Sequence, residues 1–290
     1  MSFAPFALVV SAAFIHAFWN LLSKRAADAG PSFVFAYNLV CCVAYAPWVV
    51  WLLLRDEVPW TWPAFAGIAV SGVIHLAYSL CLQRGYQVAD LSVVYPTARG
   101  TGPLLSSIGA FLLLGEAPTP SKVVGLVGVV AGIGLIATQG DLSAFRRPGG
   151  QVGVRWGIGT GTLIAAYTVV DAYVVKDLGV QPVLLDWGSN LLRFVLLAPL
   201  VLRNREHVRA RMTARWHLAV AVGVLSPLSY IFVLTALDMG APLSVVAPAR
   251  EMSMMVGALL GMIVLGEPAG PWRLIGCLAL VLGVVLLGRT

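Results

Sequence analysis

Charged residues are scarce in this chain. Only 11% of its 290 residues are Asp, Glu, Lys or Arg and 59% are hydrophobic, whereas soluble domains carry about 25% charged residues. The stretches without long apolar runs, 139–156 and 203–217, are much shorter than a domain of about 50 residues. These shortages exclude a soluble fold and a separate soluble catalytic unit, so we expect an integral membrane protein.

Residues that bind metals or carry covalent catalysis are also few. The four cysteines lie within apolar segments and show no CxxC spacing. The chain has no HExxH motif, no paired Asp motif, and no Ser with a His or Lys at catalytic spacing. We therefore expect buried thiols, no metal, no cofactor and no enzymatic activity.

Basic residues are absent from the first 15 positions, whereas a cleavable signal begins with positive charge. We therefore expect the first span to remain in the mature protein. The formal net charge of +6 comes mostly from loop ends, as expected for charges that face anionic lipid headgroups. The expected partners are the lipid bilayer and a small-molecule substrate, and not nucleic acid.

What the chain does have is ten apolar runs of about 20 residues, the length that crosses a bilayer. They lie at 5–25, 32–54, 63–83, 89–113, 120–139, 153–175, 182–202, 216–237, 242–265 and 271–288. Runs of this length with short loops satisfy their backbone in lipid only as helices. The sequence predicts an all-α integral membrane protein with ten transmembrane helices.

The second half of the chain repeats the first. Leu91 begins the segment Leu-Ser-Val-Val-Tyr-Pro-Thr-Ala-Arg, Leu243 begins Leu-Ser-Val-Val-Ala-Pro-Ala-Arg, and a Gly-Glu pair follows in each copy, at Glu116 and Glu267. Because each copy has an odd number of spans, the two copies must be inverted relative to each other. The predicted parts are a first five-helix repeat at 1–140, a linker at 141–152 and a second five-helix repeat at 153–290.

Lys and Arg are distributed unequally between the two sides of the predicted bundle. One side holds twelve: Lys24, Arg25, Arg84, Arg146, Arg147, Arg155, Arg203, Arg205, Arg209, Arg211, Arg215 and Arg273. The other side, which also holds both termini, has four: Arg55, Lys122, Lys176 and Arg289. The positive-inside rule places the richer side in the cytoplasm, so we expect both termini outside.

Each repeat has a proline-bearing fourth span, then a Gly-Glu turn and a Gly-rich fifth span, and this order resembles the EamA-like family of the drug/metabolite transporter superfamily. The resemblance covers essentially the whole chain. It implies a bundle around a central cavity lined mainly by spans 1, 3, 4, 6, 8 and 9, in a bacterial inner membrane. It also implies export of small metabolites, often amino acids, without ATP. Many bacterial relatives are described with cytoplasmic termini, from which the charge count here departs.

Polar side chains recur at helical spacing on several spans. His16 and Asn20 share a face of the first span, as His75 and Tyr78 do on the third. Polar groups are costly against lipid, so these faces should point inward. The alternative is hydrogen bonding that only holds the bundle together. The candidate substrate-binding residues on these and the later spans are His16, Trp19, Asn20, His75, Tyr78, Tyr167, Asp171 and Tyr230.

Two arginines occupy equivalent positions of the repeats. Arg99 follows Pro96, and Arg250 follows Pro248, with one residue more in the first copy. A guanidinium within the membrane can bind a substrate carboxylate bidentately. The alternatives are that Arg250 is neutralised by adjacent Glu251, itself a candidate site residue, and that Arg99 pairs with Asp171 or extends to the interface.

Prolines also predict where the fourth spans are interrupted. Proline removes a helical hydrogen bond, so Pro96, Gly100 and Pro103 predict a discontinuous helix near the middle of the fourth span. Pro248 occupies the matching place in the ninth span. We expect these four residues to act in gating.

Small and amide residues predict close packing. Gly128 and Gly132, and Gly257 and Gly261, have the GxxxG spacing of close helix contacts. The symmetric pair Asn38 and Asn190 favours structural hydrogen bonds between helices.

These features favour a secondary transporter that exports a small zwitterion, above all an amino acid, across the plasma membrane by alternating access. The candidates for proton coupling are His16, His75, Asp171 and Glu251. The alternatives are a different cargo, such as an organic cation, a nucleotide sugar or a lipid headgroup, and an intramembrane lipid enzyme. Whether the protein is a monomer or a homodimer stays open.

Overall fold

The computed structural model describes residues 2–26, 29–55, 61–203, 205–264 and 270–288, and every regular element in these ranges is a helix. Two short helices, α6 (Ser143–Arg146) and α9 (Arg205–Met212), lie in connections. The long elements are α1 (Phe3–Lys24), α2 (Pro31–Leu54), α3 (Trp62–Val88), α4 (Leu91–Leu113), α5 (Pro120–Thr138), α7 (Gly150–Lys176), α8 (Pro182–Leu202), α10 (Trp216–Asp238), the consecutive α11 (Leu243–Ala249) and α12 (Met252–Val264), and α13 (Pro271–Gly288).

The lengths of these helices match a bilayer. Nine segments in the described ranges are long and apolar enough to cross a membrane, with α11 and the start of α12 counted as one. The tenth is α4, which has 23 residues but contains Arg99 and two prolines. The predicted ten-helix membrane protein is confirmed.

Prolines and threonines set several helix starts. α2, α5 and α8 begin at a proline, whose missing N–H is not needed in the first turn. The hydroxyls of Thr61 and Thr119 accept the backbone N–H groups of Ala64 and Lys122, each at 3.4 Å, at the starts of α3 and α5. These local signals explain why predicted and observed spans agree closely at those ends.

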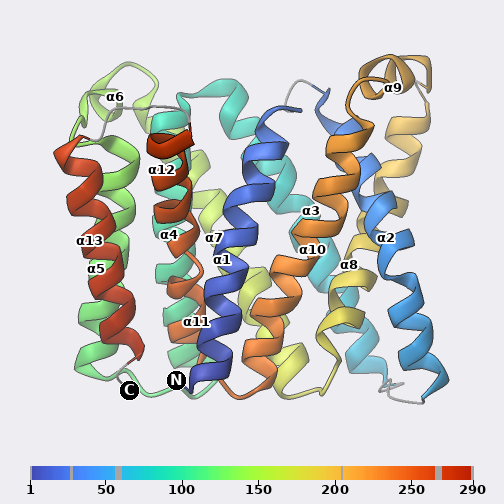
Figure 1. Cartoon of the computed structure of the whole chain (residues 1–290), viewed down its shortest axis with the longest axis horizontal. Coiled ribbons are helices and arrows are strands. Elements are labelled where there is room, and N and C mark those ends of the chain that lie inside the picture. The colour runs from blue at the N-terminus through green and yellow to red at the C-terminus, as the bar shows by residue number, and fades with distance from the viewer. Residues whose placement is uncertain (1, 27–28, 56–60, 204, 265–269, 289–290) are drawn as a thin grey trace.

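The two repeats run in opposite directions. In Figure 1, α1 leaves the face that carries the N- and C-terminal ends, whereas α7 starts at the opposite face, beside α6, and ends at the terminal face. α9 lies on the same face as α6. The inversion predicted from the odd number of spans is thus seen directly.

Contacts between the repeats hold the bundle together. α4 packs along α7, α1 along α10, α2 along α8 and α5 along α13. The seam between α5 and α13 is built on glycine: a Cβ added at Gly132 would lie 2.7 Å from the Gly276 carbonyl oxygen, and one at Gly283 2.7 Å from the Gly125 carbonyl oxygen. The close contact predicted for Gly128 and Gly132 is therefore present.

The fourth spans of the two repeats differ. α4 continues through Pro96 and Pro103, so the break predicted there is not seen. The interruption lies instead in the ninth span, where Arg250 and Glu251 separate α11 from α12. At that point Glu251 N donates to Pro248 O at 3.0 Å and Ser253 N to Arg250 O at 3.2 Å. These i→i+3 bonds form a tight turn of the kind that often marks a hinge.

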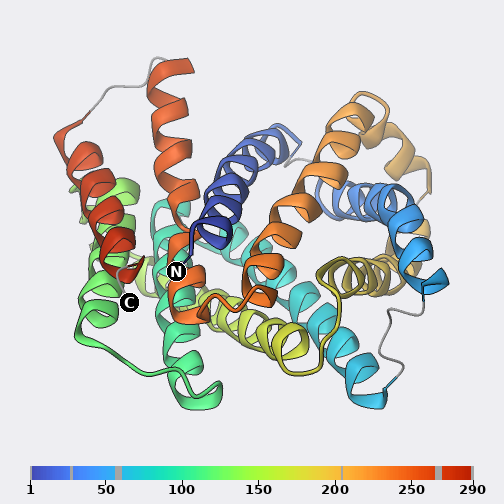
Figure 2. The same ribbon diagram turned by 60° about the horizontal axis from the view of Figure 1, so that its bottom comes forward.

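α12 also packs less closely than α4. A Cβ added at Gly102 of α4 would lie 2.9 Å from the Ile164 side chain of α7, and one added at Gly109 would lie 2.7 Å from the Val169 side chain. An added Cβ at Gly257 of α12 would meet nothing within 4 Å, so the close contact predicted at Gly257 is not seen; the surroundings of Gly261 lie outside what the structure describes. In Figure 2, α12 stands at the margin of the bundle.

Candidate functional site

An acid and four aromatic rings meet where α3, α7 and α10 come together. Asp171 Oδ2 accepts a hydrogen bond from Tyr230 Oη at 2.5 Å and lies 3.1 Å from His75 Nε2. Tyr167, one turn before Asp171 on α7, stacks on His75 with ring centroids 3.9 Å apart, and Tyr78 meets Tyr167 edge-on at 5.6 Å. Five predicted residues thus form one cluster, which we call the aromatic–acid group.

Asp171 is the only carboxylate of this group. Its side chain is 1% exposed, and its Oδ1 has no hydrogen-bond partner within the described chain. A buried carboxylate oxygen without a donor is costly. The group is therefore suited to receive a further donor, such as an ammonium.

Two arginines and one glutamate form a second cluster, which joins the repeats. Arg99 of α4 lies 2.8 Å from Glu251 Oε2 and donates to Ser253 Oγ at 3.0 Å. Arg250 Nε is 3.9 Å from Glu251 Oε1. We call these residues the arginine group; they replace the alternative pairing of Arg99 with Asp171.

The arginine group carries excess positive charge. Two guanidinium groups share one carboxylate, and the side chains of Arg99, Arg250 and Glu251 are only 11%, 6% and 1% exposed. The Nε atoms of both arginines are buried without a hydrogen-bond partner among the described residues. Because an uncompensated buried charge is costly, this group is suited to receive an anion.

Tyr167 connects the two clusters. It stacks on His75 of the aromatic–acid group, and its helix, α7, packs along α4, which carries Arg99 of the arginine group. With histidines counted as neutral, the arginine group has a net formal charge of +1 and the aromatic–acid group −1. The bundle thus holds two neighbouring buried groups of opposite sign beside an aromatic ring.

α1 contributes only part of what its sequence predicts. Trp19 Nε1 donates to Ser229 Oγ of α10 at 3.2 Å, and its ring meets that of His16 at 4.8 Å. Asn20 is exposed and donates to the His16 carbonyl of its own helix at 2.9 Å. Asn20 is therefore not brought to either cluster, since its amide is satisfied within one helix turn.

The symmetric asparagines behave differently. Asn190 donates to Asp186 Oδ2 at 3.0 Å and accepts from Arg193 at 2.6 Å, all within α8. Asn38 is fully buried, and neither atom of its amide has a partner in the described ranges. The hydrogen bonds predicted between helices are therefore not seen in the described ranges, since those of Asn190 lie within α8 and the Asn38 amide has no partner there.

Glu116 makes a contact that sequence reasoning missed. Its carboxylate, in the loop after α4, accepts the backbone N–H groups of Leu243 and Ser244 at the start of α11. The Ser244 hydroxyl and Lys176 Nζ, 3.7 Å away, complete the contact. The repeated Gly-Glu pair was the signal; its second copy, Glu267, lies outside the described residues, as does Arg289.

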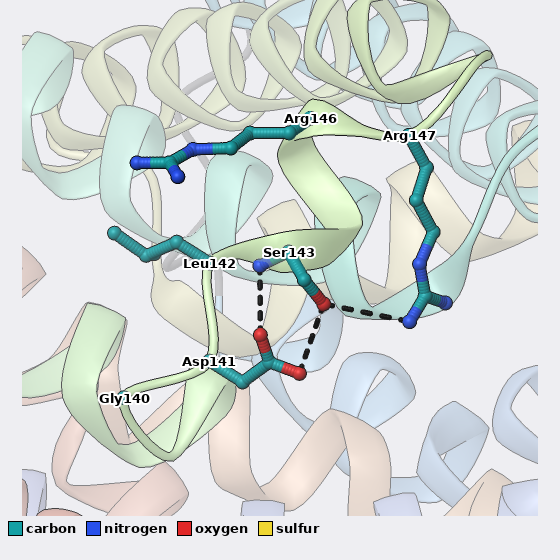
Figure 3. A pocket seen from close by; sticks show the side chains of 6 residues that line it. All are labelled: Gly140, Asp141, Leu142, Ser143, Arg146 and Arg147. Carbon is teal, nitrogen blue, oxygen red and sulfur yellow. Dashed lines mark hydrogen bonds between the residues drawn. The ribbon is translucent and has the colours of Figure 1, made fainter.

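The pocket drawn in Figure 3 lies elsewhere, in the linker between the repeats. Its volume is about 470 Å³, and it contains none of the predicted site residues. Asp141 accepts from the Ser143 backbone at 2.7 Å and from its hydroxyl at 3.0 Å, and these bonds lower the pKa of the Asp141 carboxyl. The pocket's lining residues are Gly140, Asp141, Leu142, Ser143, Arg146 and Arg147.

The residues described here contain no cluster of three or more His, Cys, Asp and Glu side chains that suits a metal. Cys41, Cys42 and Cys277 are buried and Cys81 is partly buried, all as free thiols.

Ten helices in two inverted repeats, with buried charged and aromatic groups where the repeats meet, define a multi-pass membrane protein of the transporter type. A model of the EamA-like transporter family matches residues 4–138 and again 151–289. The chain belongs to this family and is a transporter of the drug/metabolite type.

A solved structure, titled only as the crystal structure of a protein, is similar over 99% of this chain and 96% of its own, with a TM-score of 0.76. At 16% identity, this likeness concerns the fold alone. The comparison with curated proteins gives no match. The repeat boundaries at 140 and 153 stay a prediction.

Proposed function

We propose that this transporter exports small zwitterionic metabolites, and amino acids above all, by alternating access. The observation that carries the proposal is the pair of neighbouring buried groups with opposite formal charge. The arginine group would bind the carboxylate of the cargo, and Asp171 its ammonium. Tyr167 and Tyr78 would contact its side chain.

The charge balance favours a zwitterion over the alternative cargoes. A nucleotide sugar brings several negative charges, but Glu251 already offsets one of the two arginines. An organic cation would lie beside two guanidinium groups, which repel it. A zwitterion compensates the charges of both groups and brings no net charge into the bundle.

Alternating access is supported by the unequal packing of the two repeats. At the face of the termini, Glu116 of the first repeat holds the start of α11 in the second. Further along the same span, beyond the turn at Arg250 and Glu251, α12 has open space at Gly257. One access face is thus tied across the repeats while the α12 segment toward the other is loosely packed.

We further propose that the protein lies in a bacterial inner membrane with both termini outside. The loops that carry α6 and α9 share one face (Figure 1), and they hold seven of the twelve basic residues counted on the richer side. A reporter enzyme active only outside the cytoplasm, fused after residue 290, should be active; activity only after fusion within 205–212 would reverse the orientation.

Transport itself is tested with purified protein in liposomes. Liposomes loaded with one unlabelled amino acid should take up the same labelled amino acid by exchange, above empty liposomes, for at least one member of a panel. Arg99→Gln and Arg250→Gln should abolish this exchange. Arg193→Gln is the matched control, since Arg193 is also within the membrane and hydrogen-bonds to Ser189 and Asn190 of its own helix, α8. Absence of exchange for every amino acid contradicts the proposal.

A further inference from the structure

We propose that Glu251 is a specificity-determining residue that limits the cargo to one carboxylate. This inference rests on the proposed function, because it concerns the same binding groups. It goes further by assigning Glu251 a role that differs from that of a ligand for the cargo.

Glu251 pairs with both arginines and so neutralises part of their positive charge. Its Oε2 lies 2.8 Å from Arg99, and its Oε1 3.9 Å from Arg250 Nε. One resident carboxylate therefore compensates one guanidinium, and one positive charge is left over. A cargo with a single carboxylate completes the compensation, whereas a second carboxylate would add a buried negative charge without a partner.

The backbone fixes Glu251 in this place. Its N–H donates to Pro248 O in α11 at 3.0 Å, and its carbonyl accepts from Met254 N in α12 at 2.9 Å. Its side chain is 1% exposed. The buried carboxylate, with ion pairs to Arg99 and Arg250, is thus the resident counter-ion of the two arginines.

The free guanidinium atoms show where the second carboxylate belongs. Arg99 Nε and Arg250 Nε are buried and have no hydrogen-bond partner within the described ranges. Arginine binds carboxylates through two parallel N–H groups; the Nε–H of Arg99 has no acceptor, and that of Arg250 has only the distant Glu251 Oε1 at 3.9 Å, too far for a hydrogen bond. The arginine group is thus a site for one added carboxylate.

The preferred cargo should follow the formal charge of the arginine group, which can be set in the wild type and three variants. The group has a formal charge of +1 in the wild type. It becomes +2 in Glu251→Gln, 0 in Arg250→Gln, and +1 again in the double variant Arg250→Gln/Glu251→Gln. We therefore expect the wild type and the double variant to prefer a ligand with one carboxylate. Glu251→Gln should prefer two carboxylates, and Arg250→Gln none.

Glutamine and glutamate form the matched probe pair, since they have the same shape and differ by one carboxylate. Binding of each to the four full-length proteins in lipid nanodiscs is measured by thermal shift against ligand concentration. The wild type should prefer glutamine, and Glu251→Gln should prefer glutamate by about tenfold or more. The double variant should return to glutamine. Glu251→Asp, which keeps the charge, should keep the wild-type preference.

Several results overturn the proposal. The proposal fails if Glu251→Gln still prefers glutamine, or if Glu251→Gln does not bind glutamate. If Glu251→Gln does not fold, the double variant provides the test. Its arginine group has the same formal charge as that of the wild type, so a preference of the double variant for glutamate would overturn the proposal. Failure of the proposed function looks different: the wild type then exchanges no amino acid in liposomes, while the reversal between glutamine and glutamate binding remains.

Discussion

Glu116 and Ser244 belong to different repeats, yet the Glu116 carboxylate accepts the Ser244 backbone N–H at 3.0 Å. The contact ties the loop after α4 to the first turn of α11, where backbone N–H groups lack helical partners and the helix dipole favours an anion. It is a direct bond between the repeats at the face of the termini.

Loss of this carboxylate should destabilise the protein. Glu116→Ala should lower the free energy of unfolding by about 1.5–3 kcal/mol, because it removes charge-assisted hydrogen bonds from a mostly buried group. Glu116→Gln, which keeps one carbonyl acceptor, should cost less. Thermal unfolding in nanodiscs measures both, with Asp90→Ala as control, because Asp90 is exposed and its side chain makes no cap hydrogen bond. Equal stability of Glu116→Ala and wild type would refute this role.

Asp171→Asn should impair binding of the cargo ammonium. The variant keeps the size of the side chain and removes its charge, so the KM for a transported amino acid should rise about tenfold or more. Tyr230→Phe, which removes one donor to Asp171 and keeps the carboxylate, should change KM less. Exchange rates in liposomes at several concentrations give both values. The assignment fails if the two variants rank in the opposite order.

Gly132→Ala should destabilise the seam between α5 and α13. The new Cβ would lie 2.7 Å from Gly276 O, so the helices must separate, at about 1–3 kcal/mol. Gly134→Ala on the same helix meets nothing within 4 Å and should stabilise by about 0.5–1 kcal/mol, because alanine favours a helix. Thermal unfolding of the two variants measures this difference. Similar losses of stability in both would contradict the close contact between α5 and α13 at Gly132.

Pro248→Ala should slow transport without loss of fold. Alanine restores a backbone N–H within the ninth span, which favours a continuous helix across the turn at Arg250 and Glu251. Pro103→Ala in the continuous α4 is the control and should affect the exchange rate less. Exchange in liposomes, normalised to folded protein, provides the comparison. A larger defect in Pro103→Ala would place the hinge elsewhere.

The Asp141 carboxyl should titrate below its ordinary range, because Ser143 donates two hydrogen bonds to its charged form. A lowered pKa in the folded protein means that these bonds favour the fold above the ordinary pKa, and that this preference is lost as the pH falls through the lowered pKa. Carbon NMR of labelled aspartate can follow the titration. Ser143→Ala should return the pKa toward its ordinary value, and an unchanged pKa would contradict the cause.

The sequence predicts the fold well because the bilayer constrains it strongly. Apolar runs of fixed length must be helices, and an odd repeat must invert. Sequence also identifies His75, Tyr167 and Asp171 as inward-facing, since polar side chains avoid lipid. These three residues lie together in the aromatic–acid group.

Pairings between distant residues are harder to predict. Arg99 binds Glu251, and not Asp171, because the choice depends on helix rotations that periodicity leaves undefined. The break in the ninth span has a similar origin. In α4, the Thr97 hydroxyl donates to Val93 O at 2.7 Å beside Pro96, whereas the residues after Pro248 are Ala249, Arg250 and Glu251, the last of which is bound by Arg99.

The single extra residue between Pro96 and Arg99 gives the two arginines unequal positions. Arg99 reaches across to the other repeat, while Arg250 stays beside its own neighbour Glu251. Two identical inverted repeats could exchange their conformations and give an equivalent state facing the other side of the membrane. Because Arg99 and Arg250 are placed differently, such an exchange would not reproduce the same set of contacts.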